Sequence, residues 1–283
     1  MCKNPYMQGV LPFGCGQCMP CRINRRRLWA HRIVLESLKH ASSSFVTLTY
    51  APEHLPPDGS LVPRDPQLFL KRLRRAVEPL RIRFYLVGEY GERGFRPHYH
   101  ACIFGLGAES AELIASCWAL GHCHVGSLTY ESAQYCAGYV TKKMTFADDP
   151  RLAGRHPEFA RMSLRPGIGA PAMEELSEFL TTDLGSRLIA ASGDVPATLK
   201  HGGKEQPLGR YLREKLRDAL GVDSQAAKKT NLQRFFVEMQ DVYDSIKLAS
   251  PNESRKAQLV RFNKGKVRSL EARAKIYAKK EKL

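Results

Sequence analysis

The order of sequence patterns in this 283-residue chain predicts an α+β fold with a ferredoxin-like, split βαβ arrangement. Between about residues 45 and 144, strand patterns and helical patterns follow one another in the order β-α-β-β-α-β-α. Apolar residues make up 43% of the chain, which is enough for a packed core. We therefore expect a central antiparallel sheet, followed by a mainly helical C-terminal region.

Each predicted element has its own local signal. Strand patterns, rich in β-branched and aromatic residues, lie at 45–50, 82–90, 97–105 and 123–128. Helical patterns, with apolar residues on one face, lie at 22–40, 65–77, 108–118 and 132–144. The loop between the second and third strands contains two glycines, so these strands are expected to form a β-hairpin.

The character of the chain changes beyond residue 145. Residues 148–204 are rich in Gly, Pro and Ser, and helical patterns return at about 208–220 and 230–248. From residue 255 to the end, 11 Lys or Arg stand against two Glu, which is typical of a solvated helix or a flexible basic tail. The sequence thus predicts four segments, which are a Cys-rich arm (1–21), an α+β domain (22–145), a Gly/Pro-rich linker and helical region (146–254) and a basic tail (255–283).

The net charge of +16 predicts a polyanionic partner, most often nucleic acid. A protein of the membrane surface is the competing interpretation, but the chain has no apolar run near 18 residues and no signal-peptide pattern. We therefore expect a cytoplasmic protein. Candidate contacts to DNA phosphates are basic residues on two predicted helices and beside a histidine motif, namely Arg22, Arg25, Arg26, Arg27, Lys71, Arg72, Arg75 and Arg96.

The segment His98-Tyr99-His100 places two imidazoles on one face of a predicted strand. If the preceding loop closes symmetrically, Glu89 lies opposite His98 and completes a group of three ligands. Two imidazoles and a carboxylate suit a catalytic divalent ion such as Mg²⁺ or Mn²⁺, which would polarise a phosphate. A chance His-x-His on a half-exposed strand is the alternative, and a tyrosine pair downstream argues against it.

That tyrosine pair, Tyr135 and Tyr139, lies one helical turn apart, and Lys142 and Lys143 follow on the next turn. A phenol with a pKa of about 10 is a poor nucleophile at neutral pH. A nearby cation and a metal-bound phosphate would help it to ionise and attack a phosphodiester. For an isolated Tyr-x3-Tyr, the buried stripe of an amphipathic helix is the better interpretation. The lysines and the metal motif reverse that preference, so all four residues are catalytic candidates.

Three cysteines, Cys15, Cys18 and Cys21, are spaced as Cys-x2-Cys-x2-Cys, with Cys2 as a candidate fourth ligand. Thiolates at this spacing can hold structural zinc or an iron–sulfur cluster, and reduced thiols without metal fit the spacing equally well. The eight cysteines of the chain do not suggest a disulfide framework.

Five segments, in this order, resemble the HUH endonucleases, and within them the two-tyrosine rolling-circle replication initiators of microviruses, in particular the gokushovirus-like group. The matching segments are residues 15–27, 45–50, 88–91, 96–100 and 135–143. The middle residue of the histidine motif is usually a bulky hydrophobe in this family, so Tyr99 is a mild departure.

The resemblance implies that residues 22–145 form an HUH nickase domain. It implies origin nicking by a tyrosine, a 5′-phosphotyrosine link, a free 3′-OH that primes rolling-circle replication, and rejoining of the strand. The partners would be single-stranded and supercoiled circular origin DNA in the host bacterial cell, with host helicase and polymerase as further candidates.

Two other functions stay open on the sequence alone. A transposase or relaxase of the same chemistry differs in its DNA substrate. A non-catalytic basic nucleic-acid-binding protein differs in that no DNA strand becomes covalently attached to it.

Overall fold

The computed structural model of the protein describes residues 2–91, 94–139, 148–249 and 251–280. The chain forms two compact units. The larger unit comprises Arg26–Ile189 and Val195–Gly221, and the smaller comprises Met1–Arg25, Ala190–Asp194 and Val222–Leu283.

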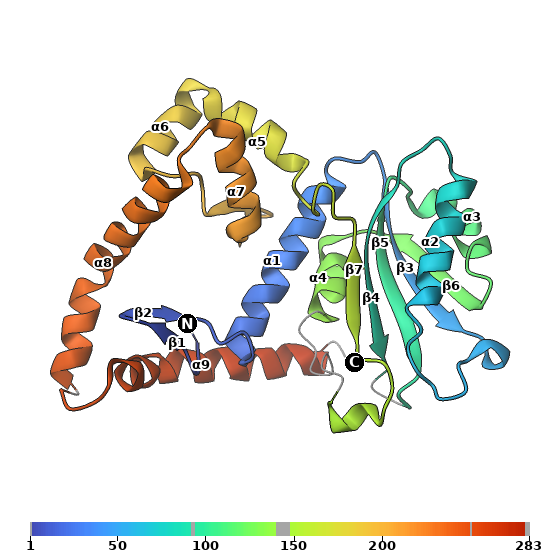
Figure 1. The fold of residues 1–283 in the computed structure, drawn as a ribbon, viewed down its shortest axis with the longest axis horizontal. Helices are drawn as coiled ribbons and strands as arrows, with labels where there is room; N and C mark the ends of the chain where they lie inside the picture. Colours follow the sequence, from blue (N-terminus) through green and yellow to red (C-terminus); the bar gives the residue numbers. More distant parts are fainter. Residues whose placement is uncertain (1, 92–93, 140–147, 250, 281–283) are drawn as a thin grey trace. The chain divides into compact units, whose positions relative to one another are not determined.

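A five-stranded antiparallel sheet forms the centre of the larger unit (Figure 1). Its strands are β3 (Ser43–Tyr50), β4 (Arg83–Tyr90), β5 (Pro97–Phe104), β6 (Gly121–Ser127) and β7 (Phe159–Met162). Their order is β6-β3-β5-β4-β7. Helix α2 (Arg64–Ala76) connects β3 to β4, and α3 (Ala111–Ser116) connects β5 to β6. The fold is therefore α+β with the predicted split βαβ arrangement, which confirms the fold class.

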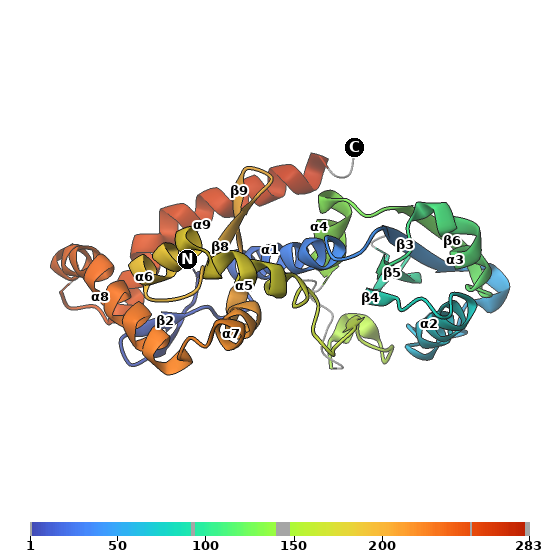
Figure 2. The ribbon, with the colours of Figure 1, turned by 90° about the horizontal axis from the view of Figure 1, so that it is seen from above.

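The two faces of the sheet are covered by different helices (Figures 1 and 2). One face packs against α2 and α3, and this core includes Leu48, Phe69 and Ile114. The other face packs against residues 26–37 of α1 (Met19–Ser37) and against α4 (Tyr130–Tyr139). Strand β3 alternates strictly between buried and half-buried positions, because its side chains point to the two faces in turn. The half-buried side chains of β3 lie on the face shared with α1 and α4.

The larger unit also contains elements that the sequence patterns did not predict. Strand β7 comes from the region predicted as a linker, and it forms the sheet edge beside β4. Helices α5 (Ala172–Thr181) and α6 (Asp183–Ser192) lie in the same region, as does a hairpin of β8 (Thr198–His201) and β9 (Lys204–Pro207). These elements are short, and a four-residue strand is too brief to show a period.

The remaining helices agree with the periodicity of the sequence. Helix α7 (Gly209–Leu220) and helix α8 (Ser224–Ala249) cover the two predicted helical patterns. Of the two interpretations of the basic C-terminal segment, the helix is found, as α9 (Arg255–Lys280). In the Cys-rich arm, β1 (Tyr6–Gln8) and β2 (Leu11–Phe13) form a small hairpin. Within the described ranges, every helix is too short or too polar to cross a bilayer.

Candidate active site

The β4–β5 hairpin brings Glu89, His98 and His100 to one face of the sheet. Tyr90 pairs with Pro97, Glu89 with His98, and Val87 with His100, so the predicted register is confirmed. Glu89 and His98 share a face because they are direct cross-strand partners, and His100 follows two residues later. Tyr99 between them points to the opposite face, where it belongs to the core beneath α2.

The three side chains form a compact group of metal-ligand atoms. Glu89 Oε1 lies 2.7 Å from His98 Nε2 and 3.3 Å from His100 Nε2. The three ligand atoms all lie within 4.8 Å of one another, so the group could hold one metal ion. Glu89 is only 2% exposed and His100 only 4%. A carboxylate this deeply buried needs a cation or strong donors beside it, and an ion bound by all three groups would supply that charge.

Contacts behind the histidines fix the orientation of both rings. His98 Nδ1 lies 3.1 Å from the carbonyl oxygen of Arg96, and a carbonyl can only accept a hydrogen bond. A neutral His98 therefore has its lone pair at Nε2, the atom that faces Glu89. His100 Nδ1 lies 2.9 Å from Thr47 Oγ1, because β3 and β5 pair these two residues directly. Partners of this kind orient the histidines of metal sites.

Thr47 was not predicted as a site residue. It lies on the half-buried face of β3, and its contact depends on pairing with a strand 53 residues later. Phe45 was also missed, and its ring stacks on His100 with centroids 5.6 Å apart and an interplanar angle of 9°. The strict alternation of β3 was visible in the sequence and could have placed both side chains on one face. The partner strand could not be known from β3 alone.

Tyr135 of α4 lies directly beside the metal-ligand group. Its ring stands edge-on to His100, with centroids 5.1 Å apart and an interplanar angle of 86°. It is also edge-on to Phe45, at 6.0 Å. Tyr135 is 45% exposed, so its phenol is open to solvent at the edge of the group. The arrangement places a nucleophile candidate next to a candidate metal site.

The buried stripe of α4 consists of other residues, which are Ala133, Cys136 and Ala137. These small side chains pack on the sheet and let the helix approach it closely. Arg26 adds a polar contact, because its Nε donates to the carbonyl oxygen of Gln134 at 2.9 Å. The interpretation of Tyr135 as a core residue is therefore wrong, since the helix turns this phenol away from its packed face.

The other tyrosine and lysine candidates are only partly described. Tyr139 is the last residue of α4, one turn after Tyr135, and its side chain lies outside the described part of the structure. Lys142 and Lys143 lie outside the described residues altogether.

Tyr99 is excluded as the nucleophile by its position. Its hydroxyl lies 2.8 Å from that of Tyr50 and accepts a hydrogen bond from the Val62 amide at 2.9 Å. Burial raises the pKa of Tyr99 to about 12, so this phenol is harder to ionise than an exposed one. The ring is inaccessible, on the sheet face away from the histidines.

The eight predicted phosphate contacts are separated into different regions. Lys71, Arg72 and Arg75 lie exposed on α2, across the sheet from the histidines. Arg26, Arg27, Arg72 and Arg96 each donate to a backbone carbonyl, of Gln134, Glu205, Cys117 and Tyr50 respectively. A guanidinium has five N–H donors, so such a contact leaves others for a phosphate. Arg96 lies two residues before His98, whereas Arg22 and Arg25 belong to the smaller unit.

A second group of candidate metal ligands lies in the smaller unit. The sulfur atoms of Cys2, Cys15, Cys18 and Cys21 all lie within 4.8 Å of one another. Amide donation from Cys18 lowers the pKa of Cys15 to about 6, whereas burial raises the pKa of Cys21 to about 12. The remaining cysteines are Cys102, Cys117, Cys123 and Cys136, which pack in the two cores of the larger unit.

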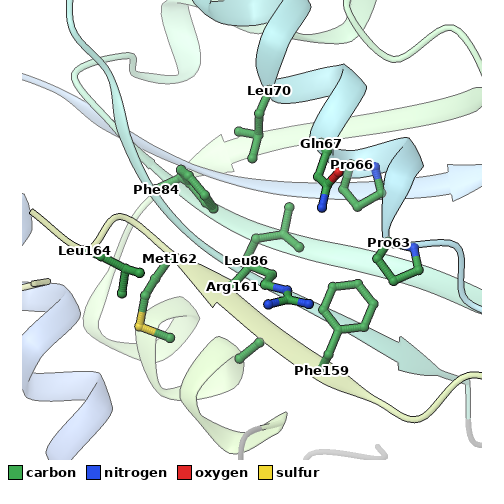
Figure 3. Close-up of a pocket in the computed structure, with 11 residues that line it drawn as sticks. Pro63, Pro66, Gln67, Leu70, Phe84, Leu86, Phe159, Arg161, Met162 and Leu164 are labelled. Atoms are coloured by element: carbon green, nitrogen blue, oxygen red, sulfur yellow. The ribbon is translucent and has the colours of Figure 1, made fainter.

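A pocket of about 280 Å³ lies between α2 and the edge strand β7, away from the candidate site (Figure 3). It is lined mainly by apolar side chains, namely Pro63, Pro66, Gln67, Leu70, Phe84, Leu86, Phe159, Ala160, Arg161, Met162 and Leu164. None of the candidate catalytic or metal-ligating residues lines this pocket.

Comparison with known proteins identifies a family whose model matches residues 43–144, described as a replication-associated protein of the ORF2 type. The match begins at β3 and includes the metal-ligand group, α4 and both lysines. One relative, the replication-associated protein ORF2 of Spiroplasma virus 4, is 30% identical over 275 residues, which cover 86% of this chain and 82% of the relative.

Two further relatives also come from phages. The replication-associated protein VP4 of Bdellovibrio phage phiMH2K is 36% identical over 159 residues, covering 48% of this chain and 50% of the relative. The replication-associated protein ORF4 of Chlamydia phage 1 is 26% identical over 240 residues, covering 77% of this chain and 57% of the relative. No solved structure matches the chain significantly.

Proposed function

Because the chain belongs to the family of ORF2-type replication-associated proteins, we propose that it initiates phage DNA replication as a tyrosine nickase and strand transferase. It would cut single-stranded or supercoiled circular origin DNA, keep one end as a 5′-phosphotyrosine link, and later rejoin the strand. The observation that carries the proposal is the exposed Tyr135 phenol beside the group of Glu89, His98 and His100.

The first step is an attack by a tyrosine oxygen on the phosphorus of the scissile phosphodiester. The phenol loses its proton, a bond forms between the tyrosine oxygen and phosphorus, and the bond from phosphorus to the 3′ oxygen breaks. The 3′ oxygen takes up a proton and becomes the 3′-OH primer. In the rejoining step a 3′-OH attacks the phosphotyrosine and releases the phenol.

The site residues divide this work between them. Glu89, His98 and His100 would hold a Mg²⁺ or Mn²⁺ ion, which polarises the scissile phosphate and neutralises its growing negative charge. Thr47 and the Arg96 carbonyl keep the two imidazoles aimed at that position. Phe45 packs against both Tyr135 and His100 and limits the positions of the phenol.

Tyr139, Lys142 and Lys143 complete the proposal on sequence spacing. Tyr139 lies one turn beyond Tyr135 and would make the second cut while the first tyrosine holds DNA. The lysine ammonium groups would lower the pKa of a nearby phenol and bind phosphate oxygens. Host helicase and polymerase would then extend the 3′-OH in the cytoplasm of the bacterial host.

The test is covalent capture of DNA. Labelled single-stranded origin DNA is incubated with the protein and Mg²⁺ or Mn²⁺, and the product is analysed under denaturing conditions. We expect an adduct that requires the ion and is lost in the His98→Ala/His100→Ala variant, while DNA binding persists. Adduct formation in excess chelator, or by that double variant, would overturn the proposed role of the metal.

A matched control exists on β6, where His122 and His124 have the same spacing and are exposed. The His122→Ala/His124→Ala variant should bind Mn²⁺ as the wild type does. An equal loss of Mn²⁺ binding in both double variants would show that the ion is not held by the proposed group.

A further inference from the structure

The N-terminal part of the smaller unit has almost no apolar core. Its hairpin consists of two three-residue strands, β1 and β2, and Tyr6 and Phe13 on it are 65% and 46% exposed. Among residues 2–25 only Cys2, Pro5 and Pro20 are buried. A two-stranded hairpin is marginally stable in water, so this segment needs a cross-link.

Four cysteines converge where such a cross-link would act. Cys2 precedes the hairpin, Cys15 and Cys18 lie in the loop that follows it, and Cys21 lies in the first turn of α1. The four sulfur atoms lie within 4.8 Å of one another, and none forms a disulfide. The group therefore connects the start of the chain, the hairpin and the first turn of α1 at one point.

The spacing of the sulfur atoms fits a single tetrahedral ion. Cys2 Sγ and Cys18 Sγ lie 3.7 Å apart. This separation is far longer than a disulfide bond of about 2.05 Å. It matches the edge of a tetrahedron whose centre is about 2.3 Å from each sulfur, which is about 3.8 Å. A cluster of several iron atoms would occupy more space and hold the sulfurs farther apart.

Backbone amides already donate toward three of the sulfurs. Cys15 N lies 3.3 Å from Cys2 Sγ, Cys18 N lies 3.4 Å from Cys15 Sγ, and Lys3 N lies 3.4 Å from Cys18 Sγ. Gly16, with φ of +74°, permits the tight turn that points the Cys18 amide back at Cys15. Such donors stabilise thiolates, which are the form in which cysteine binds metal.

From these observations we infer that Cys2, Cys15, Cys18 and Cys21 bind one Zn²⁺ ion in a closed, structural site. Four thiolates satisfy the coordination of zinc and leave no open position for a substrate. Mg²⁺ and Mn²⁺ prefer oxygen and nitrogen ligands, so this ion is distinct from the one proposed at Glu89, His98 and His100. The inference does not depend on the proposed nickase activity. Its consequence is that zinc orders residues 2–21 and fixes them to α1.

Elemental analysis of the full-length protein tests the inference. We expect about one zinc per chain after purification without added metal. The zinc should be lost in Cys15→Ser/Cys18→Ser and retained in Cys123→Ser, a control cysteine in the larger unit. It should also be retained in His98→Ala/His100→Ala, which separates this site from the candidate active site. Zinc content that is unchanged in the cysteine double variant would overturn the inference, as would iron in place of zinc.

Spectroscopy of the unmutated protein keeps the test valid if the cysteine variant fails to fold. X-ray absorption at the zinc edge should show a first shell of sulfur alone, at about 2.3 Å. Replacement of zinc by Co²⁺ should give the intense visible bands of a tetrahedral cobalt thiolate. A shell that contains nitrogen or oxygen would contradict the four-cysteine site.

Chelation should also change the protease sensitivity of the segment. Removal of zinc is expected to expose residues 2–21 to limited proteolysis, while the sheet of the larger unit stays intact. Equal cleavage of this segment before and after zinc removal would show that the ion does not order it.

Discussion

At the scale of single residues, burial and neighbours decide which tyrosine can act. Tyr135 is half-exposed and lies against His100, whereas Tyr99 is enclosed in the core with a raised pKa. Sequence spacing alone suggested the pair Tyr135 and Tyr139, and the structure supplies the position of the first. The same geometry identifies Thr47 as a positioning residue that no local sequence pattern marks.

The two tyrosines should have separable effects. Tyr135→Phe and Tyr139→Phe should each retain some nicking but fail to circularise the strand, because complete transfer needs two nucleophiles in turn. The double variant should do neither. Tyr130→Phe is the matched control on the same helix, where the hydroxyl accepts a hydrogen bond from Gln206. Normal circularisation by either single variant would contradict the two-tyrosine scheme.

Thr47 provides a prediction about the metal rather than the nucleophile. Thr47→Val removes the partner of His100 Nδ1 and should weaken Mn²⁺ binding by roughly 10- to 100-fold. Cleavage should recover at saturating Mn²⁺, because the three ligands remain.

Thr49→Val is the matched control, since this residue lies on the same face of β3 and donates to the His122 carbonyl. Isothermal titration with Mn²⁺ measures both variants. If Thr47→Val and Thr49→Val bind Mn²⁺ equally well, Thr47 has no part in orienting His100.

At the scale of elements, a hairpin could be predicted because its register follows from local symmetry. The six-residue loop between β4 and β5 gave the pairing of Glu89 with His98 directly. The pairing of β3 with β5 joins residues more than 50 positions apart, so Phe45 and Thr47 were missed. Strand β7 was missed for a different reason, because four residues at a sheet edge carry too little pattern.

The fit of β7 on the sheet can be tested at Gly88. A Cβ atom at this position would lie 2.8 Å from the ring of Phe159, its partner on β7, and 3.2 Å from Leu61. Gly88→Ala should therefore destabilise the protein by about 1–3 kcal/mol.

A smaller side chain on β7 should relieve that clash. In urea unfolding, the Gly88→Ala/Phe159→Leu variant should be more stable than the sum of the two single changes predicts. Simple additivity would contradict the packing of Phe159 on Gly88.

At the scale of the whole molecule, the charge of +16 was the first indication of a nucleic-acid partner. The family match supports that interpretation, and it confirms the resemblance that the motifs predicted. The sheet places the two groups of predicted phosphate contacts on different faces, which charge counting alone cannot show. The Arg96 side of the sheet carries the metal-ligand group, and the α2 side does not.

This separation predicts different salt dependences of DNA binding. The affinity for single-stranded DNA should fall as salt rises, in proportion to the number of phosphates contacted. Arg96→Gln should reduce the slope of log affinity against log salt by about one, whereas Arg75→Gln on α2 should leave it unchanged. Fluorescence anisotropy over a salt series measures the slopes. Equal reductions in both variants would show that DNA contacts α2 as well.

The most direct test of the central claim is to identify the residue that carries DNA after cleavage. Protein treated with single-stranded origin DNA and Mg²⁺ or Mn²⁺ is digested, and the peptide with the attached nucleotide is sequenced by mass spectrometry. The account predicts a phosphotyrosine at Tyr135 or Tyr139, formed only with the ion and a functional Glu89–His98–His100 group. Attachment at Tyr130 or Tyr99, or cleavage that leaves no covalent adduct, would contradict it.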